Sequence, residues 1–283
     1  MTGLLPLRGA LAPYIAKRSR ADRERMLDMT LRPGIDIRPN LPLRHAFDSA
    51  MPAQPLDAQI RRAIFVALFD LEDWQPWLGD AFGLLDHAEQ KRVASRRSAV
   101  HQQALAMSYA LHRLLLAKAL VCDALSVPIS RDEAGCPRIT GCTVSTSLSH
   151  AEHPAVAIAI SATGPVGVDM EAKSRASAMP ELAEWVCHPS EWRSHHAGRA
   201  GQASEALLGL WVRKEAFLKA AGVGLGWEMR SFAAPDGGVL PVPGGGCTQL
   251  AMLEAGADWT AAIAGTPGIP VTCAWLRPFS RDA

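Results

Sequence analysis

The stretch LWVRKEAFLKAA, from Leu210 to Ala221, constrains the fold more than any other part of the chain. It is rich in Ala and Leu, which favour a helix, and Gly222 follows as a natural helix end. Apolar residues occupy most sides of this helix, which indicates burial, yet the helix also contains several charges. Buried charges are costly unless they are paired or bind a metal. Glu215 and Lys219 are four residues apart and share one face, where a simple helix ion pair is the plainest interpretation.

A short strand expected from Pro165 to Glu171 carries two more acids. Its sequence PVGVDME alternates in character, so Asp169 and Glu171 point to the same face, about 6.6 Å apart along the strand. Two carboxylates on one face repel each other unless a positive group lies between them. A Mg²⁺ ion suits that position because it binds a few carboxylates together with substrate phosphates. Taken alone, however, the pair is more typical of a solvent-facing strand.

Together the two stretches resemble the paired signature of the 4′-phosphopantetheinyl transferases. The first motif is GVDME at residues 167–171, and the second is WVRKEAFLK at residues 211–219, continued by AAGVGL. A chance match would need both motifs in this order and at a suitable spacing. The resemblance extends over about residues 64–276. The length of the chain is similar to that of the larger, monomeric type, which activates peptide and polyketide synthases.

The resemblance implies a metal site and a set of catalytic residues. Asp169, Glu171 and Glu215 would bind Mg²⁺, or Mn²⁺ in its place, and the metal would neutralise the pyrophosphate of the co-substrate coenzyme A. Glu215 would also deprotonate the acceptor serine, directly or through a water, and Lys219 would balance charge on the leaving phosphate. The catalytic residues that the family implies are therefore Glu215, Lys219 and Asp169.

The residues expected to contact coenzyme A follow from further matches to the family. Ser149 and His150 resemble its Ser-His motif at the end of a strand expected over residues 143–147, although a polar turn is the alternative. Basic residues of the helix expected over residues 85–98 would hold the 3′-phosphate, although most such runs are solvated faces. The full implied set is Arg92, Arg96, Pro137, Ser149, His150, Lys214 and Lys219.

Pro137 stands in a turn that leads into a strand, where the family usually has Gly-Lys-Pro. Residue 136 is Cys instead of Lys, so a lysine contact to the nucleotide is lost, whereas backbone contacts could survive. The chain departs from the pattern of the family at this point.

The order of the expected elements favours an α+β fold. The resemblance implies two similar α/β halves, a pseudo-duplicated fold with the active site between them. Residues 60–163 would form the N-terminal half, and residues 164–283 would form the C-terminal half that carries the metal site. A turn at residues 163–165 would make the strand 155–160 and the acidic strand a hairpin that delivers the two carboxylates. We also expect strands at 64–70, 249–254, 259–264 and 271–276, and a long helix at 99–122.

The first 59 residues differ in character from the rest of the chain. Prolines recur there and no helical or strand period persists, so we expect a disordered or loosely packed extension over residues 1–59. Met51 lies shortly before the first clear strand and could be the true translation start.

Bulk composition excludes several classes of partner. Hydrophobic residues make up 48% of the chain and charged residues 20%, which is typical of a soluble globular protein. The net charge of +1 leaves no overall footprint for nucleic acid, and no apolar run is long enough to span a membrane. The six cysteines contain no Cys-x-x-Cys pair, so we expect free thiols in a reducing compartment, the cytoplasm.

The reaction implied by the resemblance moves the phosphopantetheine arm of coenzyme A onto a serine of an apo acyl or peptidyl carrier protein. Adenosine 3′,5′-bisphosphate would be the leaving group. One alternative is a non-catalytic module of the same fold that binds a carrier protein or coenzyme A, although such a module has no need of buried charges. A second alternative is another Mg²⁺-dependent enzyme that cleaves phosphate esters.

Overall fold

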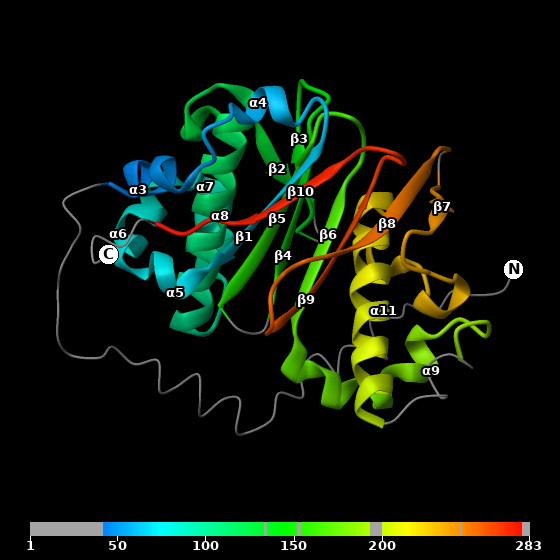
Figure 1. The fold of residues 1–283 in the computed structure, drawn as a ribbon. Helices are drawn as coiled ribbons and strands as arrows, with labels where there is room; N and C mark the ends of the chain where they lie inside the picture. The colour runs from blue at the N-terminus through cyan, green and yellow to red at the C-terminus, as the bar shows by residue number, and fades with distance from the viewer. Residues whose placement is uncertain (1–41, 133–134, 152–153, 193–199, 244, 279–283) are drawn as a thin grey trace, which may run out of the picture.

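The computed structural model describes residues 42–278, except residues 133–134, 152–153, 193–199 and 244. Two four-stranded sheets pack face to face in the middle of the molecule, and a helix of 22 residues covers the outer face of each (Figure 1). These helices are α8 (Ala99–Leu120) on the first sheet and α11 (Ala200–Ala221) on the second. The fold is therefore α+β, as the sequence predicts.

The first sheet joins strands from distant parts of the chain. Strand β1 (Ile64–Asp70) pairs antiparallel with β5 (Ala155–Ser161), which pairs antiparallel with β4 (Ser145–His150). On its other side β1 pairs in parallel with β10 (Val271–Trp275). Strand β1 is apolar from Ile64 to Phe69 because these residues are buried on both faces of the sheet. Phe65, Ala67 and Phe69 belong to the core under α8, whereas Ile64, Val66 and Leu68 pack against the second sheet.

The second sheet is antiparallel throughout and carries the acidic motif. Its strand order is β6 (Gly167–Ala172), β9 (Trp259–Gly265), β8 (Cys247–Leu253) and β7 (Val239–Pro241). Val168 and Met170 of β6 pack against the first sheet. Because side chains alternate along a strand, Asp169 and Glu171 lie on the opposite face, toward α11. The shared face predicted for the two acids is thus confirmed.

A close approach between β6 and α11 brings the two sequence motifs together. A Cβ atom on Gly167 would lie 2.0 Å from the carbonyl oxygen of Ala216 and 2.4 Å from the amide nitrogen of Ala220. Only glycine fits there, since both contacts are with helix backbone. The glycine that opens the GVDME motif therefore allows the helix to lie directly on the strand.

The two sheets are also joined edge to edge by serine side chains. Strand β4 carries Ser145, Ser147 and Ser149 at alternate positions, and each hydroxyl accepts a hydrogen bond from a backbone N–H of the β6 segment. The donors are Val166 at 3.3 Å, Val168 at 3.1 Å and Met170 at 3.3 Å. We call this row of contacts the serine seam. These backbone N–H groups are buried, and the serine hydroxyls take the place of the carbonyl oxygens that a neighbouring strand would offer.

The remaining elements are short and lie around the two sheets. They are α3 (Leu43–Ala50), α4 (Leu56–Gln59), α5 (Leu71–Trp74), η1 (Gln75–Trp77), α6 (Leu78–Ala81), η2 (Phe82–Leu84), α7 (His87–Ala94), η3 (Ala124–Ser126), β2 (Ile129–Arg131), β3 (Pro137–Ile139), η4 (Lys173–Leu182), α9 (Ala183–Val186), η5 (Gly224–Gly226) and η6 (Met229–Ser231).

The structure corrects the expected connection between the two sheets. Strands β5 and β6 do not form a hairpin, because β5 pairs with β1 and β4 whereas β6 pairs with β9. The chain at residues 162–166 instead crosses from one sheet to the other. Strand β10, expected in a C-terminal half over residues 164–283, lies in the first sheet. The boundary between two halves and their duplication remain predictions.

The structure also corrects the extension expected over residues 1–59. Residues 1–41 lie outside the described residues, but α3 and α4 pack into the core of the first sheet. Leu43, Phe47 and Leu56 are buried there. The prolines of this segment interrupt the hydrophobic periodicity that a sequence prediction relies on. The burial of these side chains depends instead on contacts with residues far away in the sequence. No helix among the described residues is long and apolar enough to cross a membrane, and all six cysteines are free thiols.

Candidate active site

Asp169 is the centre of the candidate site. Its Oδ1 accepts hydrogen bonds from Ser149 Oγ at 2.7 Å and from Lys219 Nζ at 2.7 Å. Lys219 also donates to the carbonyl oxygen of Val168 at 3.0 Å. Asp169 is buried, and its Oδ2 has no hydrogen-bond partner within the described part of the chain. One carboxylate oxygen is thus held in place, and the other is left for a ligand.

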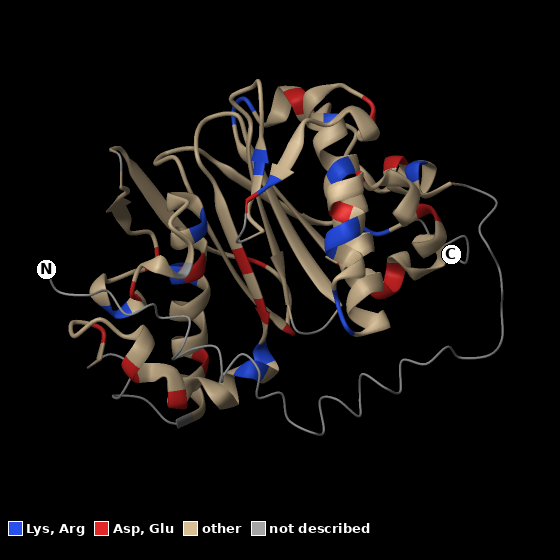
Figure 2. Ribbon diagram, turned by 180° about the vertical axis from the view of Figure 1, so that it is seen from behind, with Lys and Arg blue, Asp and Glu red and all other residues tan. Residues whose placement is uncertain are grey.

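Glu171 lies on the same face two residues further along β6. Its Oε1 forms an ion pair with the guanidinium of Arg175, the third residue of η4. Figure 2 shows the acidic positions in the middle of the molecule and basic positions where η4 begins. The guanidinium of Arg175 also lies 5.1 Å from the centre of the Trp211 ring on α11, within the range of a cation–π contact.

Glu215 and Lys219 face this acidic pair from α11. Burial, followed by repulsion from Asp169, raises the pKa of Glu215 to about 7, against the opposing effects of Lys219 and Arg175. Burial disfavours the charge on Lys219, but Asp169 and Glu215 outweigh burial and raise its pKa. The structure therefore brings Asp169, Glu215 and Lys219 into one electrostatic cluster, with Glu171 beside them.

The cluster has the donor chemistry of a site for a hard divalent cation. Three carboxylates lie in this cluster. Asp169 Oδ2 is buried without a hydrogen-bond partner among the described residues, and burial, followed by Asp169, raises the pKa of Glu215. Among the described residues, however, no group of three His, Cys, Asp or Glu side chains already has the geometry of a metal site. The pairing of Glu171 with Arg175 gives a physical reason, since the carboxylate is held by another cation.

Comparison with known proteins assigns this cluster to a family. Residues 165–261 match the model of the 4′-phosphopantetheinyl transferase superfamily. This part of the chain is a domain of that superfamily. The match runs from two residues before β6 into β9 and includes Asp169, Glu171, Glu215 and Lys219. No curated protein matches the chain at a significant level.

Lys214 lies within the superfamily domain but does not join the cluster, contrary to its expected contact with coenzyme A. Its side chain is fully buried, and Nζ donates to Glu191 Oε2 at 2.7 Å. Nζ also donates to the carbonyl oxygens of Val186, Met229 and Phe232 at 2.6–2.8 Å. With these acceptors around one ammonium, Lys214 ties two loops to α11 and has no donor left for a ligand.

Two of the residues predicted to bind coenzyme A outside the superfamily domain, Arg96 and Ser149, lie near a third, His150. This residue is exposed at the end of β4, which continues through it instead of ending at Ser147. The pKa of His150 is lowered, most of all by desolvation and next by the nearby cations Arg131, Lys219 and Arg96. Water weakens this effect at an exposed site, but its direction means that the ring is neutral at pH 7. Three cations thus lie near a neutral imidazole, which suits an anion.

Arg92 and Pro137 support this region in different ways. Arg92 donates from Nη2 to the carbonyl oxygen of Asp132 at 2.9 Å, so it braces the turn before β3. Pro137 is the first residue of β3. Its neighbour Cys136 lies close to the cluster: burial and then Asp132 raise the pKa of its thiol, and Lys219 is among the groups that oppose them. The turn is therefore close to Lys219 and Glu215 of the acidic cluster.

Arg131 is a candidate binding residue that the sequence reading missed. Its side chain is only 5% exposed and lies 3.9 Å from the centre of the Tyr109 ring. It bonds to Glu89 Oε1 at 3.3 Å and to His112 Nδ1 at 3.2 Å, whereas Nη1 is buried without a hydrogen-bond partner among the described residues. An available guanidinium N–H is a donor for phosphate. The only signal in the sequence was a basic residue directly before the expected turn.

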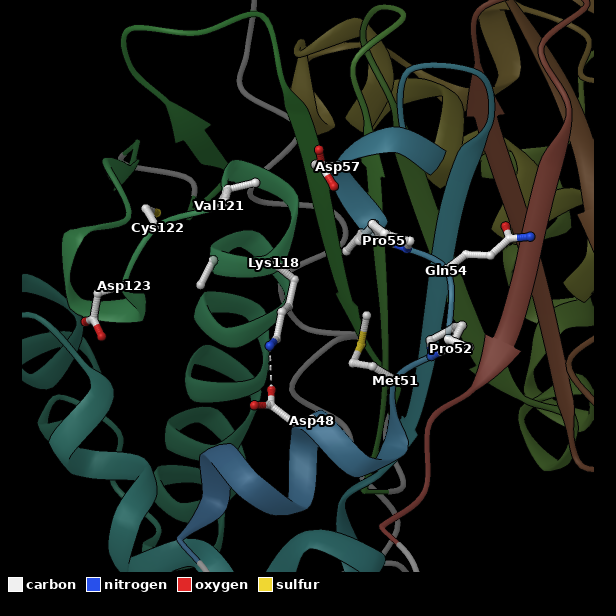
Figure 3. A pocket seen from close by; sticks show the side chains of 13 residues that line it. Asp48, Met51, Pro52, Gln54, Pro55, Asp57, Lys118, Val121, Cys122 and Asp123 are labelled. Carbon is white, nitrogen blue, oxygen red and sulfur yellow. Dashed lines mark ion pairs between the residues drawn. The ribbon is translucent and has the colours of Figure 1, made fainter.

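A separate pocket of about 660 Å³ lies between the segment that joins α3 to α4 and the end of α8 (Figure 3). None of the predicted site residues lines it. Most of its charged groups are paired with protein groups, since Lys118 lies 2.8 Å from Asp48 and Arg44 bonds to Asp123. The pocket thus lacks the concentration of titratable groups found around Asp169.

Proposed function

We propose that the chain transfers the 4′-phosphopantetheine arm of coenzyme A to a serine of an apo acyl or peptidyl carrier protein. Adenosine 3′,5′-bisphosphate would be released, and the chain would act as a monomer. The superfamily domain supports phosphopantetheine transfer in general. The observation that carries the specific proposal is the contact between Asp169 and Lys219 beside Glu215, since transfer between phosphate esters depends on arranged charges.

Each residue of the cluster has a role in this proposal. Asp169, Glu171 and Glu215 would hold Mg²⁺, which when bound would neutralise charge on the pyrophosphate. Glu215, with a pKa raised to about 7, is suited to accept the proton of the carrier serine near neutral pH. Lys219 fixes Oδ1 of Asp169 and would balance the charge that develops on the leaving phosphate.

The nucleotide half of coenzyme A would lie against the basic residues around His150. Arg96, Arg131 and His150 would attract the 3′-phosphate, and Arg92 would support the turn that precedes Pro137. The buried Nη1 of Arg131 supplies a donor in the region where the chain lacks the lysine expected at residue 136. Lys214 has no part in binding, because its ammonium is fully engaged within the protein.

The test is incubation of an apo acyl carrier protein and an apo peptidyl carrier domain with the protein, coenzyme A and Mg²⁺. Mass spectrometry should show one phosphopantetheinyl group on the carrier serine, and chromatography should show adenosine 3′,5′-bisphosphate in equal amount. The Asp169→Asn variant is the matched control and should give neither product. Binding of coenzyme A without any product would favour a non-catalytic module. Cleavage of coenzyme A without modification of the carrier would favour another phosphate-cleaving enzyme.

A further inference from the structure

Three acids in the candidate site are opposed by two cations of the protein itself. Lys219 holds Asp169, and Arg175 holds Glu171. Within the described part of the chain Glu215 forms no direct ion pair, and its charge is opposed by Lys219 and Arg175 from nearby. Lys219 belongs to the family motif, whereas Arg175 lies outside both motifs and has no role in the proposed reaction.

We propose that Arg175 is a built-in counter-ion of the acidic site, which a divalent cation must displace from Glu171 in order to bind. This inference rests on the metal site of the proposed function. Glu171 uses Oε1 for the guanidinium. A guanidinium and a metal ion both require the negative charge of that carboxylate, so they compete for it.

The position of Arg175 suits a cation that holds the acid and can leave it. It follows Glu171 by four residues at the start of η4, so the two are linked by a short stretch of chain. The guanidinium also lies over Trp211, which is one helical turn before Glu215 on α11. Displacement from Glu171 would therefore leave Arg175 held at the edge of the site by the indole ring.

The pair of Arg175 and Glu171 is less exposed than an ordinary surface ion pair. Exposed pairs contribute little because water screens both charges, and they give a protein no particular response to metal. Here the side chains of Arg175 and Glu171 are 20% and 10% exposed, and the acid is one of three that converge. Lys173, two residues earlier in η4, is exposed and forms no ion pair with the described residues, so it offers a matched charge for comparison.

The test is a titration of the free protein with Mn²⁺, without coenzyme A or carrier. The electron paramagnetic resonance signal of unbound Mn²⁺ measures how much of the metal has bound. Arg175→Gln should lower the dissociation constant for Mn²⁺ about threefold to tenfold, because it frees the contested carboxylate. Lys173→Gln removes the same charge and should change the constant by less than about twofold, because an exposed charge is screened. Arg175→Lys keeps a cation in place and should stay closer to the wild type than Arg175→Gln. Circular dichroism would check that each variant is folded.

A double variant separates direct competition from a general electrostatic effect. In the Glu171→Gln background, Arg175→Gln should no longer tighten Mn²⁺ binding, because the contested carboxylate is absent. The inference is overturned if Arg175→Gln leaves the affinity unchanged or weaker, or if its effect persists in that background. If Mn²⁺ behaves as expected but no carrier is modified, the proposed function fails and the counter-ion role stands. If the carrier is modified but Arg175→Gln has no effect on Mn²⁺, the counter-ion role alone fails.

Discussion

Ser149 and Asp169 meet across the seam between the two sheets, with Ser149 Oγ donating to Asp169 Oδ1 over 2.7 Å. The same hydroxyl accepts from the N–H of Met170 at 3.3 Å. Ser149 is buried, so these two contacts satisfy a group that has little access to solvent. A residue that the family motif associates with coenzyme A therefore orients a carboxylate of the acidic cluster.

We expect Ser149→Ala to raise the Mg²⁺ concentration needed for half-maximal transfer about tenfold. A hydrogen bond to a charged group contributes about 1.5–3 kcal/mol, and its loss frees Asp169 to rotate away from the site. Ser147→Ala is the matched control, since the Ser147 hydroxyl accepts from the N–H of Val168 in the same seam and contacts no carboxylate among the described residues. Both variants should lose similar stability. An equal rise in the Mg²⁺ requirement for Ser147→Ala would show that the seam as a whole, and not Ser149, matters.

The raised pKa of Glu215 predicts a pH-dependent cost to stability. Its pKa of about 7 in the fold exceeds its ordinary value of 4.5, mainly because of burial and next because of Asp169. The folded state therefore holds a proton that the unfolded state releases, and stability falls as the pH rises from about 4.5 to 7. Glu215→Gln cannot ionise, so without divalent cations it should exceed the wild type in stability at pH 8 by about 1–2 kcal/mol, after allowance for screening.

Urea unfolding of both proteins at pH 5 and pH 8 measures this difference. Groups that titrate equally in both proteins cancel in the comparison. The free energy of unfolding of Glu215→Gln should therefore exceed that of the wild type by more at pH 8 than at pH 5. A gain that is absent, or larger at pH 5, would contradict the assigned burial of Glu215.

His150→Ala should raise the KM for coenzyme A more than it lowers kcat. The ring lies near Arg131, Lys219 and Arg96, at the nucleotide end of the proposed site. The loss of one polar contact to phosphate corresponds to roughly tenfold in KM. Coenzyme A lacking its 3′-phosphate is the control substrate, and the variant should handle it about as well as the wild type does. A fall in kcat with unchanged KM would place His150 at the reacting phosphorus instead.

The sequence predicts those features that depend on local period and composition. Strand β1 has the expected bounds, and α8 begins at the expected residue and ends two residues early. Alternation along β6 was enough to put Asp169 and Glu171 on one face. The glycine of the GVDME motif marks the helix contact that the structure explains.

Features that depend on distant contacts could not be predicted in this way. Strand order is set by tertiary packing, so neither the place of β10 beside β1 nor the serine seam leaves a local signal. Lys214 and Lys219 are both basic and lie on one helix, but five residues turn the helix by roughly 140°, which separates their surroundings. The helical periodicity of the sequence does not show whether the face with Lys214 or the face with Lys219 contacts the acidic residues.

A chain that starts at Met51 should be markedly less stable than one that starts at Pro42. Phe47 of α3 is fully buried, and its ring centre lies 6.4 Å from that of Phe69 and 6.1 Å from that of Trp74. Removal of one such ring costs about 3–5 kcal/mol, so loss of α3 should lower the midpoint of thermal unfolding by many degrees. Equal midpoints for the two chains would restore the view that residues before Met51 are a loose extension.

Substitution by Met should mainly reduce stability at Lys214 and mainly reduce transfer activity at Lys219. Lys214→Met removes the donor that serves Glu191 and three carbonyl oxygens in the interior, and loss of one partner of a buried pair costs about 3–5 kcal/mol. Lys219 is 24% exposed, so Lys219→Met should cost less stability but should abolish most transfer activity, because Asp169 loses its positive partner. Urea unfolding and the transfer rate under folding conditions measure the two effects on the same samples. If Lys214→Met proved stable yet inactive, with a raised KM for coenzyme A, the ammonium would have to reach the ligand in spite of its four internal contacts.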